Sequence, residues 1–561
     1  MFLAVELCLA AMCIPLALMS PKLGDYRFHR IEQWFSALAQ RKTLMVISVG
    51  FLALGIRSAL LPILPIPQPK LTDEFSYLLQ ADTFAHGRLA NPTHPMWVHF
   101  ETFQENWKPT YASMYYPGLG AFLAVGQVLM HHPFWGVWLS SGLMCAAICW
   151  ALQGWLPAGW ALLGALLAVI RLGSFSYWAD SYWGGTVTAL AGALVIGALP
   201  RIKKHQRARD SIVLALGMAL LAYSRPYEGL FFCIPVLIAL IWWAKRTPVS
   251  RGQLAARVVA PFLVVLAIAL TGLGYYFYSV TGSPFTTGYQ VNIRTYGLVY
   301  FPWDKLQPVA LRHPEMQMMY SGGPLPVWYD MARHHPLQLQ SLKALVVWLF
   351  FFGPIFTLPI VTWLVSRPRR SFWKSFSPDL RFLLLLCAVT YSSCMLTIYI
   401  GQPHYVAHLA PVFYVLLMLM LMELYDSANP SLRFVARAVP VVCVLLLGAR
   451  IGAPIFHLGP NPSWSRTWCS EDEQNLDRAR VLDQLQHEPG KQLVIVRYQP
   501  GHNFIMDEWV YNNADIDDSK VIWARDMGPQ NAELVQYFKD RHVWLAQPDY
   551  TPVRLVPYEQ R

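Results

Sequence analysis

The sequence predicts an all-α polytopic membrane protein with about eleven to twelve transmembrane helices and a small α/β domain at its C-terminal end. Two observations predict the membrane fold: an apolar composition and a long series of apolar runs. Of the 561 residues, 55% are hydrophobic and only 14% are charged, which is too apolar for a soluble chain of this length. A third observation, the change to a soluble composition from about Trp464 onward, predicts the separate domain.

Apolar runs recur along the chain at the spacing expected of membrane spans. A spanning helix needs about 20 mainly apolar residues. The first run, from Met1 to Met19, has the length of a signal peptide, but Glu6 interrupts it and no charged segment precedes it, so we expect an additional helix. The other runs lie at residues 44–64, 134–154, 160–172, 186–199, 212–223, 230–243, 258–278, 342–365, 382–399, 406–424 and 435–455.

Positive charge in the short loops predicts how the chain is oriented. Because basic loops stay in the cytoplasm, the basic clusters place the loops 65–133 and 281–341 and the C-terminal domain outside. We therefore expect a multi-pass protein of the cell (inner) membrane whose active site and C-terminal domain are extracytoplasmic. The segment from Gly118 to Met130 would reverse the later loops if it spanned, so we expect a juxtamembrane helix there. The clusters are Arg41-Lys42, Arg201–Arg209, Lys245–Arg257, Arg367–Arg381, and Arg433 with Arg437.

These patterns divide the chain into three parts. Residues 1–43 form an N-terminal helix and a cytoplasmic loop, residues 44–457 form the transmembrane domain, and residues 458–561 form the outer α/β domain. The net charge of +11 lies largely in the short loops, so it predicts topology and no nucleic-acid partner. In the outer domain we expect helices at 471–486 and 530–538 and strands at 493–496, 521–524 and 543–546, without a glycine-rich nucleotide loop.

An acidic pair, Asp73 and Glu74, follows the span 44–64 at the outer edge of the membrane. Acids at this point are good helix-start residues, so capping is one interpretation. A sugar transfer from a phosphate leaving group also needs a carboxylate that takes the acceptor's proton. The membrane edge is where a lipid-linked donor would present its scissile bond, and we therefore expect Asp73 and Glu74 to be catalytic.

The layout of the chain resembles the GT-C superfamily of polyprenyl-phosphate-dependent glycosyltransferases. The resemblance covers about Leu44 to Ile455 and depends on the acidic pair after the first core span, a long outer loop with the motif Tyr116-Pro117-Gly118, and about a dozen spans. The layout is similar to that of protein O-mannosyltransferases and lipid A aminoarabinose transferases. The resemblance implies that Asp73 is the base that activates the acceptor, and it gives Asp180 an acidic counterpart in some relatives.

Two outer turns supply further candidate residues for binding the substrate. In the turn 223–229, Arg225 could hold a lipid phosphate and Glu228 could orient it, with Tyr227 beside them; a structural Arg–Glu pair is the alternative. In the turn 177–185, Asp180 and Tyr182 accompany aromatic residues that could stack on a sugar, although an aromatic belt with a helix cap would look the same.

His404 and His408 have the i, i+4 spacing that can bind a metal, but no third ligand is visible. We expect His404 to face a phosphate or lipid headgroup, and a divalent metal is left open as the only cofactor. The second outer loop is expected to act as a lid because of its Gly and Pro content, including Gly322-Gly323.

The sequence therefore predicts a membrane glycosyltransferase that takes a sugar from a polyprenyl-phosphate-linked donor lipid and passes it to an acceptor, a lipid, glycan or protein, on the outer face. An oligosaccharide ligase or polymerase is the alternative within the enzyme class. A transporter or flippase is the alternative outside it. No internal repeat is visible and the polar motifs gather at one membrane edge, which favours an enzyme.

Overall fold

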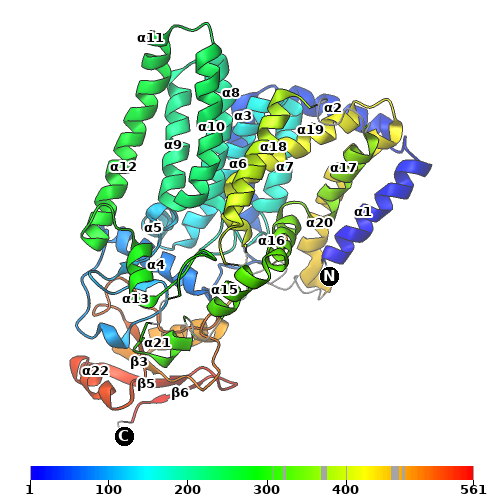
Figure 1. Ribbon diagram of the computed structural model, residues 1–561. Helices are drawn as coiled ribbons and strands as arrows, with labels where there is room; N and C mark the ends of the chain where they lie inside the picture. The colour runs from blue at the N-terminus through cyan, green and yellow to red at the C-terminus, as the bar shows by residue number, and fades with distance from the viewer. Residues whose placement is uncertain are drawn as a thin grey trace.

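The computed structural model describes residues 2–306, 309–318, 320, 324–367, 376–399, 401–456, 466–470 and 474–559. Most of the chain forms a helical bundle, and the C-terminal domain packs against one end of it (Figure 1). Helix α11 (Arg251–Leu254), in one of the basic loops, lies at the opposite end. Gly322 and Gly323, which we expected to contribute to a lid, lie outside the described residues.

Within the described residues, eight helices are long and apolar enough to cross a membrane, and one bent pair raises the number to nine. The bent pair is α16 (Pro336–Phe351) and α17 (Gly353–Ser366), whose axes differ by 97°. The eight are α1 (Phe2–Met19), α3 (Lys42–Ala59), α6 (Phe134–Trp155), α8 (Thr186–His205), α10 (Pro226–Arg246), α11 continued by α12 (Ala260–Thr281), α19 (Ala410–Tyr425) with the preceding 3₁₀ turn η5 (Pro403–Leu409), and α20 (Pro430–Gly452).

Three further apolar runs form shorter helices inside the same bundle. They are α7 (Ala158–Leu172), α9 (Ala208–Ser224) and α18 (Pro378–Cys394), with 15, 17 and 17 residues. Helix α7 packs on α6 and α19, α9 packs on α8 and α12, and α18 packs on α10. The predicted all-α membrane fold is confirmed, while the described residues contain eight to nine full-length spans instead of eleven to twelve because these three helices end early.

The first apolar run forms a helix that is built into the bundle. Glu6 of α1 is 2% exposed, and one of its oxygens accepts hydrogen bonds from Arg171 (3.0 Å) and from the backbone N–H of Ile355 (3.3 Å). The other oxygen accepts from the indole of Trp468 at 3.0 Å. The break between α16 and α17 exposes backbone N–H groups of the kind that a carboxylate satisfies. Glu6 therefore attaches α1 to the bend.

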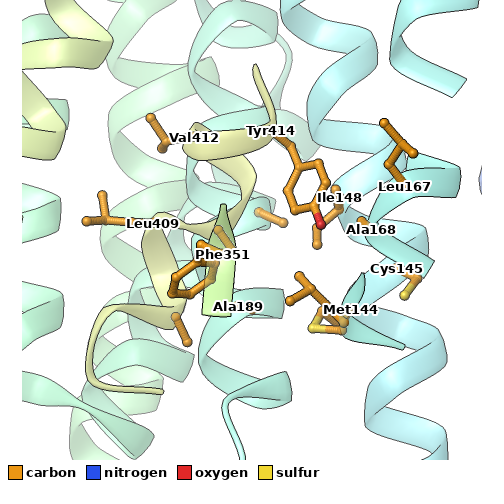
Figure 2. Close-up of a cluster of buried hydrophobic side chains, with 14 of the residues drawn as sticks. Met144, Cys145, Ile148, Leu167, Ala168, Ala189, Phe351, Leu409, Val412 and Tyr414 are labelled. Carbon is orange, nitrogen blue, oxygen red and sulfur yellow. The ribbon is translucent and has the colours of Figure 1, made fainter. Parts of the chain in front are cut away.

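Side chains from five segments of the bundle interlock in its core (Figure 2). Interiors of this kind are close-packed, so each side chain fills the space that its neighbours leave. The residues are Met144, Cys145 and Ile148 of α6, Leu167 and Ala168 of α7, Ala189 of α8, Phe351 of α16, and Leu409, Val412 and Tyr414 of η5 and α19, all of them buried.

Two helices outside the main bundle lie at the end that faces the C-terminal domain, namely α4 (Thr72–Ala85) and α5 (Pro117–Met130). Helix α5 is the short helix that we expected between Gly118 and Met130. It crosses α6 at Gly126 and Gly136, where a Cβ on Gly126 would lie 2.1 Å from the Gly136 nitrogen. A two-stranded ribbon, β1 (Glu105–Asn106) with β2 (Ala112–Ser113), connects them. The other short helices are α2 (Asp25–Ala39), α13 (Gly288–Tyr296), α14 (Pro314–Gln317) and α15 (Pro324–His334).

The C-terminal domain is a small mixed sheet with two helices. Its strands are β3 (Lys491–Val496), β4 (Val521–Arg525), β5 (Arg541–Gln547) and β6 (Arg554–Pro557), in the order β4-β3-β5-β6. Strand β3 is parallel to β4 and β5, and β6 runs antiparallel to β5. Helices α21 (Leu476–His487) and α22 (Asn531–Tyr537) correspond to the predicted ones, whereas the short edge strand β6 was not predicted.

Candidate active site

The Glu74 carboxylate is fully occupied by backbone donors. One oxygen accepts hydrogen bonds from the N–H groups of Lys70 (3.0 Å) and Leu71 (3.2 Å), and the other accepts from that of Tyr182 (3.1 Å). A carboxylate in the first turn that accepts from backbone N–H groups before it satisfies donors that have no partner within the helix. Burial raises the pKa of Glu74, and the three N–H groups act in the opposite direction. Glu74 therefore fixes the start of α4 and holds the turn 177–185 against it.

The Asp73 carboxylate, in contrast, is partly exposed and faces other polar side chains. It accepts a hydrogen bond from the Tyr115 hydroxyl. Burial raises the pKa of Asp73, while the Tyr115 hydroxyl, the Arg225 guanidinium and the Gln104 side chain all act to lower it. A carboxylate whose proton affinity is raised in this way is better suited to accept a proton near neutral pH than an ordinary exposed aspartate.

Gln104 reaches Asp73 from a strained backbone position. Its φ of 59° lies in the left-handed region, which a residue with a Cβ adopts at a cost of about 1 kcal/mol or more. Its carbonyl accepts hydrogen bonds from the Ser76 hydroxyl (2.7 Å) and the Met114 N–H (3.1 Å), which hold this conformation. The Gln104 side chain also acts on the Asp73 carboxylate and lowers its pKa. This position connects the first turn of α4 to the ribbon β1–β2.

Arg225 lies at the junction of α9 and α10 with its guanidinium available. The junction forms here because Pro226 starts the new helix and removes the N–H that would continue the old one. The Arg225 Cζ atom lies 4.8 Å from the centre of the Tyr405 ring, and its nearest carboxylate is that of Glu228, at 3.9 Å. The Arg225 side chain is 18% exposed and makes no hydrogen bond to any residue that the structure describes. Its two N–H edges therefore remain free for an anion.

Tyrosine rings surround Asp73 and Arg225. Tyr77 stacks on Tyr115 with ring centres 4.3 Å apart, and Tyr289 packs edge-on against Tyr115 at 5.6 Å. The Tyr405 ring lies beneath the Arg225 guanidinium, and Tyr77 lines the same hollow as Arg225. A narrow hollow beside the guanidinium is lined by Tyr77, Tyr116, Leu119, Gly184, Val187, Thr188, Ser224 and Arg225. Among the described residues, the site therefore brings together the Arg225 guanidinium, the Asp73 and Glu228 carboxylates and several phenol hydroxyls.

An apolar groove neighbours this pocket and encloses about 830 Å³, its open side included. Its walls come from α4, α5, α9 and α12, and their lining is almost wholly apolar. Tyr223 and Pro117 of the groove adjoin Ser224 and Tyr116 of the hollow in sequence. The lining residues are Phe84, Leu89, Pro117, Ala121, Ala124, Tyr223, Gly272, Tyr275 and Tyr276.

Two of the predicted binding residues, Asp180 and Tyr182, make contacts with other residues of the protein, in the turn that Glu74 holds against α4. Asp180 pairs with Arg57 at 2.8 Å, and the exposed fractions of the two side chains are 2% and 0%. Arg57 also donates to the carbonyls of Ala179 (3.1 Å) and Leu64 (2.9 Å). The Tyr182 hydroxyl donates to the Pro67 carbonyl at 3.0 Å. These contacts make the turn 177–185 a support for α4.

Tyr227 and His404 also have protein partners. The Tyr227 hydroxyl donates to the Ser393 carbonyl at 3.1 Å, which attaches α10 to α18. The His404 Nδ1 atom lies 2.9 Å from the Tyr177 hydroxyl. His408, one helical turn further, is fully buried against Phe232. No group of three His, Cys, Asp or Glu side chains in the described part of the chain could hold a metal ion.

The structure thus brings together Asp73, Arg225 and Glu228 of the predicted residues and adds Tyr77, Tyr115, Tyr289 and Gln104. Tyr77 could have been found from the sequence, because it lies four residues after Asp73 and so on the same face of a helix. Tyr115, Tyr289 and Gln104 gave no such signal, since long-range folding of the loops 65–133 and 281–341 positions them.

No known protein family matches the sequence, and no curated protein is matched by it. Solved structures similar in overall fold include the oligosaccharyltransferase of Archaeoglobus fulgidus in the apo form, with 12% identity and a TM-score of 0.47 over 81% of this chain and 62% of that one. Its complex with Zn and sulfate has 14% identity and a TM-score of 0.48, over 90% of this chain and 67% of that one. ArnT of Cupriavidus metallidurans bound to undecaprenyl phosphate has 11% identity and a TM-score of 0.45, over 90% of this chain and 92% of that one. The chain thus spans somewhat less than two thirds of the apo archaeal enzyme.

Proposed function

We propose that this protein is a membrane glycosyltransferase that moves a sugar from a polyprenyl-phosphate donor to an acceptor on the outer face of the membrane. The observation that carries the proposal is the electrostatic interaction of the Asp73 carboxylate with Arg225, whose guanidinium lies beside a narrow hollow. A carboxylate with a raised pKa can take a proton, and a guanidinium with free N–H edges can hold a phosphate. These are the two groups that a transfer from a phosphate leaving group requires.

The arrangement suits a single displacement at the anomeric carbon. Asp73 removes the proton from the acceptor's hydroxyl or amine as the nucleophile forms its bond to that carbon. The bond between the anomeric carbon and the phosphate oxygen breaks at the same time, and its electron pair leaves with the phosphate. Arg225 lies beside a narrow hollow and holds the negative charge that gathers there. One displacement inverts the configuration of the anomeric carbon.

The apolar groove supports a lipid-linked donor over a soluble one. It adjoins the pocket through consecutive residues of α5 and α9, so a phosphate at Arg225 could be attached to a chain that lies along the groove. Each buried CH₂ group contributes about 0.8 kcal/mol, which would retain a long isoprenoid far better than a nucleotide.

The proposal is tested by comparing donors with purified full-length protein in vesicles. Labelled sugars are presented as polyprenyl monophosphates, polyprenyl diphosphates and nucleotide diphosphates, with a membrane extract as the source of acceptors. We expect transfer from the polyprenyl monophosphates, together with release of polyprenyl phosphate. Transfer from nucleotide sugars, or from none of the lipid-linked donors in a broad sugar panel, would contradict the proposal.

A further inference from the structure

The C-terminal domain contacts the first turn of α4 directly beside the acidic pair. The ring of Tyr511 stacks on that of Phe75, with centres 4.3 Å apart and planes 4° from parallel. The Arg478 guanidinium also lies over the Phe75 ring, with its Cζ atom 4.8 Å from the ring centre, and donates to the Tyr511 carbonyl at 3.1 Å. Because Phe75 is two residues after Asp73, these contacts restrain the turn that carries the carboxylate.

The C-terminal domain also contacts the loop 101–104, which carries Gln104. Arg525 of β4 donates to the Glu101 carbonyl (2.6 Å) and the Thr102 hydroxyl (3.4 Å). The Tyr511 hydroxyl donates to the Phe103 carbonyl at 3.4 Å. Three consecutive residues before Gln104 are therefore bound by side chains of the C-terminal domain. Both the turn that carries Asp73 and the loop that carries Gln104 are therefore positioned by the C-terminal domain.

The residues of the C-terminal domain that hold the loop 101–104 are almost completely buried. Arg525 is 1% exposed and pairs at 2.6 Å with Glu508, which is 0% exposed. Glu508 also accepts hydrogen bonds from the Tyr498 hydroxyl and from the Val510 N–H. A buried ion pair contributes little net stability, because desolvation offsets its attraction, but removing one partner is costly. Such a pair therefore fixes geometry more than it adds affinity between the two parts.

We propose that the C-terminal domain is a positioning element of the active site, and that Tyr511 and Arg525 set the relative placement of Asp73 and Gln104. This inference rests on the proposed function, because the placement has a kinetic meaning only if Asp73 takes a proton. Loss of the Tyr511 contacts moves the first turn of α4 and the loop 101–104 independently. The Gln104 side chain then no longer acts on the Asp73 carboxylate, and the carboxylate is displaced from the acceptor.

The variants separate positioning from simple attachment of the domain. Tyr511→Ala removes both the stacking on Phe75 and the hydrogen bond to Phe103, whereas Tyr511→Phe keeps the stacking. The matched control is Asp515→Asn, which weakens another contact of the same domain with the first outer loop, the pair of 2.7 Å hydrogen bonds from Arg88. Asp515 touches neither Phe75 nor the loop 101–104. Arg525→Lys tests the second contact without removing its charge.

The kinetic readout is kcat, donor KM and the pH profile of transfer. A displacement of about 1 Å at a reacting group can lower the rate about 100-fold, so we expect Tyr511→Ala to lower kcat by 10- to 100-fold with little change in donor KM. Its acid limb should move to higher pH, because Gln104 no longer lowers the pKa of Asp73. Tyr511→Phe and Arg525→Lys should show smaller changes in the same direction. Asp515→Asn should leave all three quantities unchanged.

The structural readout is hydrogen exchange of the full-length protein in detergent, which does not depend on any activity. We expect faster exchange of the amides of residues 72–76 and 101–106 in Tyr511→Ala and not in Asp515→Asn. Equal exchange in both variants, or an unchanged pH profile in an active Tyr511→Ala variant, would overturn the inference. If no lipid-linked donor is used by the wild type, the proposed function fails, and the exchange measurement alone then decides whether the domain positions this turn.

Discussion

The Tyr115 hydroxyl donates a hydrogen bond to the Asp73 carboxylate. The two residues are 42 positions apart, on the first turn of α4 and on the segment that follows β2. The hydroxyl stabilises the ionised carboxylate and so works against burial, which raises the pKa of Asp73. The balance between these two effects determines the pH at which Asp73 can accept a proton, and this balance can be measured.

Tyr115→Phe should move the acid limb of the transfer activity to higher pH. A base works in its deprotonated form, and removing a donor that favours the carboxylate raises the pKa of Asp73 further. A hydrogen bond to a charged group contributes about 1.5–3 kcal/mol, so a shift of about one pH unit is expected. The measurement is kcat/KM against pH for both proteins. An unshifted or acid-shifted limb would show that Asp73 is not the titrating base.

Arg225→Lys should impair use of the donor while leaving the protein folded. Lysine keeps the charge, but it loses the two parallel N–H edges that bind a phosphate and cannot reproduce the contact with Tyr405. We expect kcat/KM for the lipid donor to fall by about 10- to 100-fold, which corresponds to about 1.4–2.7 kcal/mol. The melting temperature in detergent should stay close to that of the wild type. Full activity in Arg225→Lys, combined with misfolding of Arg225→Ala, would identify Arg225 as structural.

Much of the fold could be predicted from the sequence, because apolar runs and helix-start residues are local signals. Thr72, Asp73 and Glu74 begin α4 as their residue types favour. The edge strand β6 gave no such signal, because its four residues, Arg554–Pro557, are few and end in proline. The lengths of α7, α9 and α18 depend on where the chain turns back inside the bundle, which hydropathy does not indicate.

The candidate site could be predicted in part for the same reason. Asp73 and Arg225 are each marked by a charge next to an apolar run, and such charges are rare enough to indicate function. Asp180 carries the same signal, yet its carboxylate pairs with Arg57, which lies 123 residues earlier. Local sequence does not show which of these acids forms a direct ion pair with an arginine. It also does not show that Gln104 and Tyr115 arrive at Asp73 from a distant loop.

Reporter fusions should confirm the orientation that the basic loops predict. Reporters joined after Lys204 and Lys245 are expected in the cytoplasm, and reporters joined after Pro92 and Arg561 are expected outside. The measurement pairs an enzyme reporter that is active only outside with a fluorescent one that is active only inside. A C-terminal fusion that reads as cytoplasmic would place the pocket on the inner face and reverse the proposed side of the reaction.

Asp180→Ala should destabilise the protein, because it leaves Arg57 buried without a counter-charge. Removing one partner of a buried ion pair costs about 3–5 kcal/mol, and we expect a clear fall in the melting temperature in detergent. Asp180→Asn keeps an acceptor for the Arg57 hydrogen bond and should lose less. If Asp180→Ala melts like the wild type but no longer transfers sugar, Asp180 takes part in the reaction and its role is not only to support α4.

Asp73→Asn is the substitution on which the mechanism depends. Asparagine matches the size of aspartate and can still receive the Tyr115 hydrogen bond, but it cannot take a proton from the acceptor. Loss of a general base typically lowers a rate by about 10²–10⁴, far more than the roughly 1 kcal/mol effect of a lost helix cap on a stable protein. We expect Asp73→Asn to insert, purify and bind the donor lipid normally while transfer falls by that factor. The assay is transfer of labelled sugar at matched protein levels.

Glu74→Gln is the matched control for that substitution, because the neighbouring acid is bound by three backbone N–H groups instead of facing the pocket. Glutamine can still accept through one oxygen, but its NH₂ group would oppose the N–H donors on the other side. Glu74→Gln should therefore lower the melting temperature and the yield, while the rate per folded molecule stays within about tenfold of the wild type. The opposite pattern, with Asp73→Asn active and Glu74→Gln folded but inactive, would transfer the role of base from Asp73 to Glu74. Because both acids lie on the same turn, only this pair of measurements distinguishes a residue that takes the proton from one that holds the turn in place.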